Sequence, residues 1–205
     1  MKTKLALSIA LLLSASPFAL AAPPNQPGHE APAPNTTNDT VSAVKDATGH
    51  AVGTISAEMT TSLKGFVDAA AVSDMYEVEA GKIAMQRSQD PAIKEFAQKM
   101  VAAHTGTTDE LKATLTRINA SVSPPSTLDN RHQGMIDELR GAKDADFDGR
   151  YLAQQVDAHN EALILMRGYA KDGDTKDVKT FANKTQKAVQ QHLNMAQKLK
   201  DQHNS

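Results

Sequence analysis

Apolar residues recur every three to four positions along most of the chain beyond residue 62, the spacing of one face of an α-helix. Polar stretches interrupt this pattern and divide it into segments. No stretch alternates apolar and polar residues in the manner of a β-strand. The pattern predicts four long helices and one short helix, at about 62–88, 91–119, 127–140, 146–171 and 175–202.

Residues that start or stop helices stand at the ends of these segments. Asp90 and Pro91 supply an N-cap followed by a proline at the first helical position. Residues 121–125 break the chain, and Asp172 and Gly173 end the third long segment. Two long hairpins joined by a crossover with a short helix are therefore expected. This connectivity predicts an all-α fold, a ferritin-like four-helix bundle over residues 61–203.

Four ionisable side chains lie near the centres of the long apolar stripes. They are Glu77, His104, His159 and His192, one on each predicted long helix. Burying a carboxylate or an imidazole is costly unless the group is hydrogen-bonded, ion-paired or bound to a metal. These four residues are therefore the candidate site. Glu79 lies on nearly the opposite face from Glu77, so we expect it to be more exposed.

Height along the helices decides which of these side chains can meet. Glu77 and His104 lie at almost equal distances from the first predicted turn, so we expect them to be buried as a contacting pair. His192 lies five residues farther from the second turn than His159 does. Five residues correspond to about 7.5 Å of helix rise. We therefore expect His159 and His192 to be roughly one turn apart.

The start of the chain predicts export. Lys2 and Lys4 precede an apolar run over residues 5–13, and Ala19 and Ala21 complete a small-residue cleavage pattern. Residues 1–21 are therefore predicted to be a cleaved signal peptide. Residues 22–60 are predicted to be a proline-rich flexible linker with weak helical turns. We expect a periplasmic or secreted protein.

Composition excludes several classes of protein. The chain has no cysteine, which removes disulfides, thiolate metal sites and a lipid-bearing cysteine after the signal. The net charge of −2, the absence of tryptophan and the lack of a basic patch argue against nucleic-acid binding. No later apolar run approaches a membrane span of about 20 residues. The sequence leaves a protein partner and the oligomeric state open.

Each long segment also carries a short motif centred on its candidate residue. The motifs are Glu77-Val78-Glu79 with Gly81, Phe96-Ala97 with Met100, Val101 and His104, Phe147-Asp148 with Tyr151, Gln155, Val156 and His159, and Phe181-Ala182 with His192, Leu193 and Ala196. With these motifs, the chain resembles a family of bacterial exported proteins of unknown function, described as periplasmic or outer-membrane proteins and predicted to be ferritin-like. The resemblance spans about residues 66–199. It implies a fold more than an activity.

Two positions depart from that family. Ala103 stands where the family usually has an aspartate, which removes a carboxylate next to His104. Lys187 stands where the family usually has a proline in the fourth helix.

Ferritin-type di-iron chemistry is disfavoured by the motifs. Such a centre needs two Glu-x-x-His motifs, but Val101 and Val189 stand three residues before His104 and His192. No hydrolase or nucleotide-binding motif occurs either, and we expect no enzymatic activity.

Two interpretations of the polar core residues stay open. In the one favoured by the sequence alone, the histidines are neutral, hydrogen-bonded core residues of a non-catalytic interaction or stress-associated domain. In the alternative, Glu77 and the histidines, chiefly His104 and His159, hold one divalent ion, either zinc, iron or copper.

Overall fold

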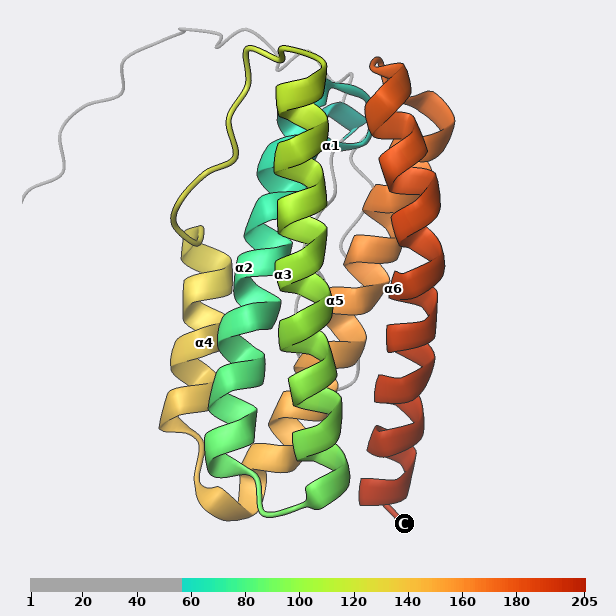
Figure 1. The fold of residues 1–205 in the computed structure, drawn as a ribbon. Helices are drawn as coiled ribbons and strands as arrows, with labels where there is room; N and C mark the ends of the chain where they lie inside the picture. Colours follow the sequence, from blue (N-terminus) through green and yellow to red (C-terminus); the bar gives the residue numbers. More distant parts are fainter. Residues whose placement is uncertain (1–56) are drawn as a thin grey trace, which may run out of the picture. The chain divides into compact units, whose positions relative to one another are not determined.

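The computed structural model describes residues 57–205, and the regular structure in this range is entirely helical (Figure 1). The all-α prediction is confirmed. The predicted signal peptide and most of the predicted linker lie outside the described residues. The helices are α1 (Ala57–Thr61), α2 (Leu63–Arg87), α3 (Pro91–Arg117), α4 (Asn130–Gly141), α5 (Asp144–Asp172) and α6 (Lys176–His203).

The four long helices lie side by side (Figure 1). The short turns between α2 and α3 and between α5 and α6 make two antiparallel hairpins. The hairpins meet through contacts of α2 with α5 and of α3 with α6. Helix α4 belongs to the crossover between the hairpins and packs on α2 and α5. No helix within residues 57–205 is long and apolar enough to cross a membrane.

Side-chain caps set where the helices begin. The Asp90 carboxylate accepts a hydrogen bond from the Ala92 N–H at 2.7 Å, with Pro91 in the first turn as expected. The short crossover helix begins about three residues later than predicted. The reason is that Asp129 caps it, accepting a hydrogen bond from the His132 N–H at 2.8 Å.

The end of α3 has a left-handed residue. Asn119 has a φ of 51°, and the Ala120 N–H donates to the Leu115 carbonyl at 3.0 Å. This is the hydrogen bond of a Schellman motif, in which asparagine tolerates the left-handed conformation better than most residues do. The helix therefore stops two residues before its predicted end.

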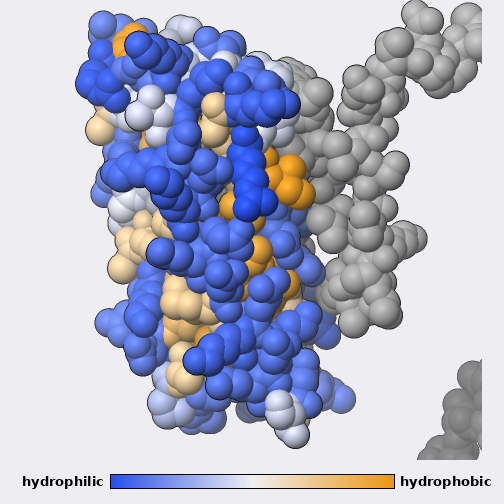
Figure 2. Space-filling view, turned by 90° about the vertical axis from the view of Figure 1, so that its right-hand side faces the viewer, coloured by the Kyte–Doolittle hydropathy of each residue, from blue (hydrophilic) through white to orange (hydrophobic). Residues whose placement is uncertain are grey.

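The core consists of two apolar clusters with polar residues between them. One cluster includes Phe66, Tyr169 and Phe181, and the other includes Tyr76 and Phe147. Along each long helix, the polar candidate residues fall near the change from one cluster to the other. The outer face shown in Figure 2 is largely hydrophilic with smaller apolar areas, as amphipathic helices require.

Candidate metal centre

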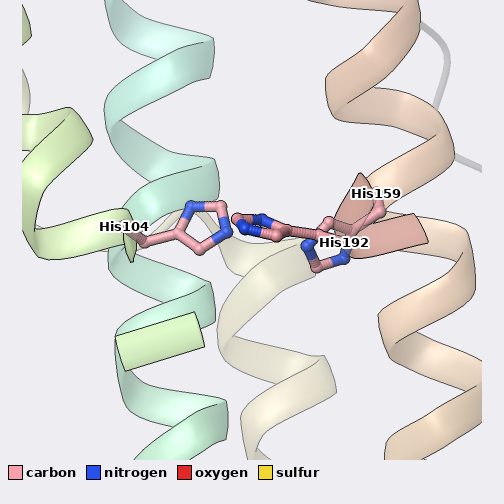
Figure 3. A group of neighbouring side chains, drawn as sticks. All are labelled: His104, His159 and His192. Atoms are coloured by element: carbon pink, nitrogen blue, oxygen red, sulfur yellow. The ribbon is translucent and has the colours of Figure 1, made fainter. Parts of the chain in front are cut away.

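Three imidazoles from three different helices converge in the polar layer: His104 of α3, His159 of α5 and His192 of α6 (Figure 3). The ring centroids are 5.6 Å apart in all three pairs. One ring nitrogen of each residue lies within 4.8 Å of those of the other two. Three of the four candidate residues are thus brought together.

The meeting of His159 and His192 corrects our expectation that they lie a turn apart. Helix α5 ends at Asp172 and α6 begins at Lys176, so the turn is centred on Asp174 and the offset is three residues, about 4.5 Å. Side chains lean toward the N-terminus of their helix. In this antiparallel pair the two rings therefore lean toward each other, which closes the remaining gap.

Two of the three rings are held from behind by hydrogen bonds. His104 Nδ1 lies 2.7 Å from Asp74 Oδ1, and His159 Nδ1 lies 2.8 Å from the Gln155 carbonyl oxygen. Because a carbonyl can only accept, Nδ1 of His159 carries the proton and Nε2 carries the lone pair. Within residues 57–205, the Nε2 atoms of both residues are buried and have no hydrogen-bond partner.

The hydrogen-bond partner of His104 is Asp74, which corrects the expected pairing with Glu77. Asp74 and His104 lie equally far in sequence from Gln89, the centre of the observed first turn. They are therefore level in the antiparallel hairpin. Asp74 is only 3% exposed, and its other oxygen accepts a hydrogen bond from the Thr108 hydroxyl at 3.1 Å. Its place three residues before Glu77, on the same helix face, was the signal that could have identified it.

Glu77 is buried, as expected, but lies behind the cluster. Its Oε1 is 3.5 Å from His159 Nδ1, and the Gln155 side chain lies near enough to hydrogen-bond the carboxylate and favour its ionised form. Among the described residues, the Tyr151 hydroxyl is buried without a hydrogen-bond partner. Glu79 is more exposed and pairs with Arg140, as its phase on the helix predicted.

Burial controls the charge of these groups. Burial, followed by the charge of His104, lowers the pKa of His159 and of His192 to about 3, so both rings are neutral at ordinary pH. Burial also lowers the pKa of His104, but the hydrogen bond to Asp74 and the charges of Glu77 and Asp74 outweigh it and raise the pKa. Burial raises the pKa of the Asp74 and Glu77 carboxyls. Neutral imidazole is the form that binds a metal, so His159 and His192 already have that form and His104 gives up a proton when it binds.

Comparison with known proteins gives one family. The family described as a domain of unknown function, DUF4142, matches residues 49–199. No curated protein and no solved structure matches the chain significantly. The resemblance to a family of unknown function is confirmed to this extent, while the export and the ferritin-like fold that it implied stay predictions.

Proposed function

The chain belongs to the DUF4142 family, and we propose that its function is to bind one divalent transition-metal ion through His104, His159 and His192. The observation that supports this proposal is the convergence of three imidazoles in the core, where Nε2 of His104 and of His159 are buried and find no partner among residues 57–205. Buried polar atoms are seldom left without a partner in folded proteins, and a bound ion is one explanation. Three imidazoles suit zinc, copper or iron and leave a coordination position open.

The competing interpretation, a purely structural polar layer, accounts for fewer of the observations. A structural layer stabilises a fold when its members satisfy one another's hydrogen bonds. Among the described residues, only one nitrogen of His104 and one of His159 is satisfied, and the buried Nε2 of each has no partner. A single ion placed where the three rings meet would give each imidazole the partner that it lacks.

The two buried carboxylates fit the same proposal as outer partners of the ligands. Glu77 is not among the residues whose donor atoms meet within 4.8 Å, so we assign it, like Asp74, a place behind an imidazole. Carboxylates in this position orient a ligating histidine and raise its basicity. When ionised, the two carry a charge of −2, which a divalent cation neutralises in a medium where unbalanced charge is costly.

The proposed setting is a ferritin-like bundle in an exported protein. Two long hairpins joined by a crossover with a short helix support this arrangement, since ligands in such bundles come from facing helices. The lysines and apolar run of residues 1–21 support export. We propose binding of the ion without enzymatic turnover.

Metal titration of the untagged protein, first freed of metal with a chelator, tests this proposal. We expect one Zn²⁺ or Co²⁺ per chain by elemental analysis and calorimetry. His104→Ala and His159→Ala should each abolish stoichiometric binding. His203→Ala is the matched control, because His203 is exposed at the C-terminal end of α6, eleven residues beyond His192, and its loss should leave binding unchanged. No stoichiometric ion in the wild type, or full binding by His159→Ala, would refute the metal site.

Thermal unfolding provides a second readout of the same site. A ligand that binds only the folded state at 100 times its Kd stabilises it by about 2.7 kcal/mol. For a chain of this size that corresponds to a rise in Tm of roughly 5–10 °C. The rise should vanish in His159→Ala and persist in His203→Ala.

A further inference from the structure

The three histidines are not held equally, and from this asymmetry we infer that the site exchanges its ion through His192, as a carrier does, instead of retaining it permanently. The inference rests on the proposed function. It assigns the three ligands different roles: two of them form a fixed base for the ion, and the third opens to let it pass.

His104 and His159 form the fixed base. His104 is 4% exposed and is hydrogen-bonded to Asp74, whose second oxygen is tied to Thr108. His159 is 1% exposed and is hydrogen-bonded to the Gln155 carbonyl of its own helix. Hydrogen bonds behind a ring fix its orientation before the ion arrives. These two imidazoles therefore lose little conformational freedom on binding and are almost completely shielded from solvent.

His192 has neither the near-complete burial nor the hydrogen bond behind the ring that hold the other two histidines. Within residues 57–205, neither of its ring nitrogens is hydrogen-bonded, and its ring contacts are with the imidazoles of His104 and His159. It is also the one histidine of the cluster that is only partly buried. A side chain that is partly in solvent and not tied from behind can rotate away at lower cost than its two neighbours. The side of the site next to His192 is therefore where another ligand can reach the ion.

The exchange step is a simple ligand substitution. A donor atom of an incoming chelate or acceptor protein, a carboxylate, imidazole or thiolate, forms a bond to the ion with its own lone pair. The bond from the ion to His192 breaks, and the imidazole leaves as a neutral group. The ion then leaves His104 and His159 in the same way. No electron is transferred, and the ion keeps its oxidation state throughout.

Release kinetics test the inference. The full-length protein loaded with Zn²⁺ is mixed in a stopped-flow instrument with increasing excess of the coloured chelator 4-(2-pyridylazo)resorcinol. Because the chelator takes part in the exchange step, we expect the release rate to rise in proportion to its concentration. A release rate that does not change with chelator concentration would overturn the inference, since the ion would then leave only after a slow opening of the protein.

Variants separate the roles of the ligands. His192→Ala should still bind one ion, with weaker affinity and with release faster by on the order of tenfold. His104→Ala should lose the ion altogether, and Gln191→Ala, an exposed neighbour on α6, should behave as the wild type. Equal loss of binding in His192→Ala and His104→Ala would contradict the inference. A wild type that binds no ion would instead refute the proposed function, so the two failures are distinguishable.

Discussion

Among residues 57–205, Asp74 is the hydrogen-bond partner that orients the ring of His104. One of its oxygens meets His104 Nδ1 at 2.7 Å and the other accepts the Thr108 hydroxyl hydrogen bond, so the carboxylate cannot turn without losing a contact. It is buried, and its burial is tolerable because both oxygens are satisfied. Asp74 therefore connects the partly buried Thr108 of α3 to His104 and through it to the imidazole cluster.

Asp74→Asn should therefore weaken zinc binding while leaving the chain folded. The amide keeps the size of the side chain but removes the negative charge that orients and polarises His104, so we expect affinity to fall by roughly 10–100-fold. Competition with a chelator dye measures the change. Glu79→Gln is the control, because Glu79 is partly exposed and faces Arg140. Unchanged affinity in Asp74→Asn would show that His104 needs no partner behind its ring.

At the scale of the helices, α2 and α3 pack so closely that the contact position at Gly81 has no room for a larger side chain. A Cβ built on Gly81 would lie 2.8 Å from Val101 Cγ2 and 3.1 Å from the Ala97 carbonyl oxygen. Valine has essentially one rotamer in a helix, and the carbonyl belongs to the backbone, so neither neighbour can move aside easily. The glycine thus sets the distance between α2 and α3 one turn away from the imidazole cluster.

Gly81→Ala and Gly106→Ala should change stability in opposite directions. The clash at Gly81 costs about 1–3 kcal/mol, which exceeds the gain of about 1 kcal/mol from replacing a helical glycine by alanine. A Cβ added to Gly106 on α3 would have no described atom within 4 Å. Only the gain in stability from replacing a helical glycine therefore applies there. Urea unfolding without metal measures both. A stabilised Gly81→Ala variant would show that the hairpin can spread at little cost.

The turn between α5 and α6 is tied to the start of α2 by Asp174. Its carboxylate accepts hydrogen bonds from the Leu63 N–H at 3.0 Å and from the Tyr169 and Thr175 hydroxyls at 2.7 and 2.9 Å. Burial alone would raise the pKa of Asp174, but these hydrogen bonds lower it below its ordinary value. The ionised carboxylate is therefore favoured more strongly in the folded state than in the unfolded chain.

The sign of this shift predicts an effect of acid. A lowered pKa in the folded state adds stability above the unfolded pKa of about 3.9, and this stability is lost as the pH falls through the folded pKa. Asp174→Asn should therefore be less stable than the wild type at neutral pH, and the difference should shrink below about pH 4. Urea midpoints at neutral and acid pH measure this. Asp172→Asn is the control, because that carboxylate faces Lys171 at 3.5 Å instead of α2.

At the scale of the whole domain, Arg87 joins the two hairpins at the crossover. As the last residue of α2, it donates to the carbonyls of Leu139 and Ala142 at 2.6 and 2.7 Å, and its guanidinium lies 4.7 Å from the centroid of the Phe147 ring. The carbonyls belong to the end of α4 and the turn before α5. One charged group therefore attaches the end of the crossover to the first hairpin.

Arg87→Ala should destabilise the domain by about 2–3 kcal/mol, because hydrogen bonds from a charged donor and a cation–π contact are lost together. Arg117→Ala is the control. Its guanidinium is largely exposed and pairs with Asp177, so its loss should cost less than about 1 kcal/mol. Calorimetry without metal measures both. Equal effects of the two substitutions would show that the crossover is held by its apolar contacts alone.

The sequence by itself determined the helical class, the order of the helices and most of their ends. Those features depend on local properties: the spacing of apolar residues, the cap at Asp90 with Pro91 behind it, and the breaks between segments. The same periodicity identified which faces are buried, so the burial of Glu77, His104 and His159 and the greater exposure of Glu79 were predictable. The later start of α4 shows the limit, since Ser126 and Asp129 both suit a cap.

Only the tertiary structure decided which buried groups meet. The partner of His104 and the convergence of His192 with His159 depend on where each turn is centred and on the opposite lean of side chains in antiparallel helices. Moving the centre of a turn by one residue changes the offset between facing positions by two residues, about 3 Å. That shift brings Asp74 instead of Glu77 level with His104, and a hydrogen bond is too short-ranged to tolerate such an offset.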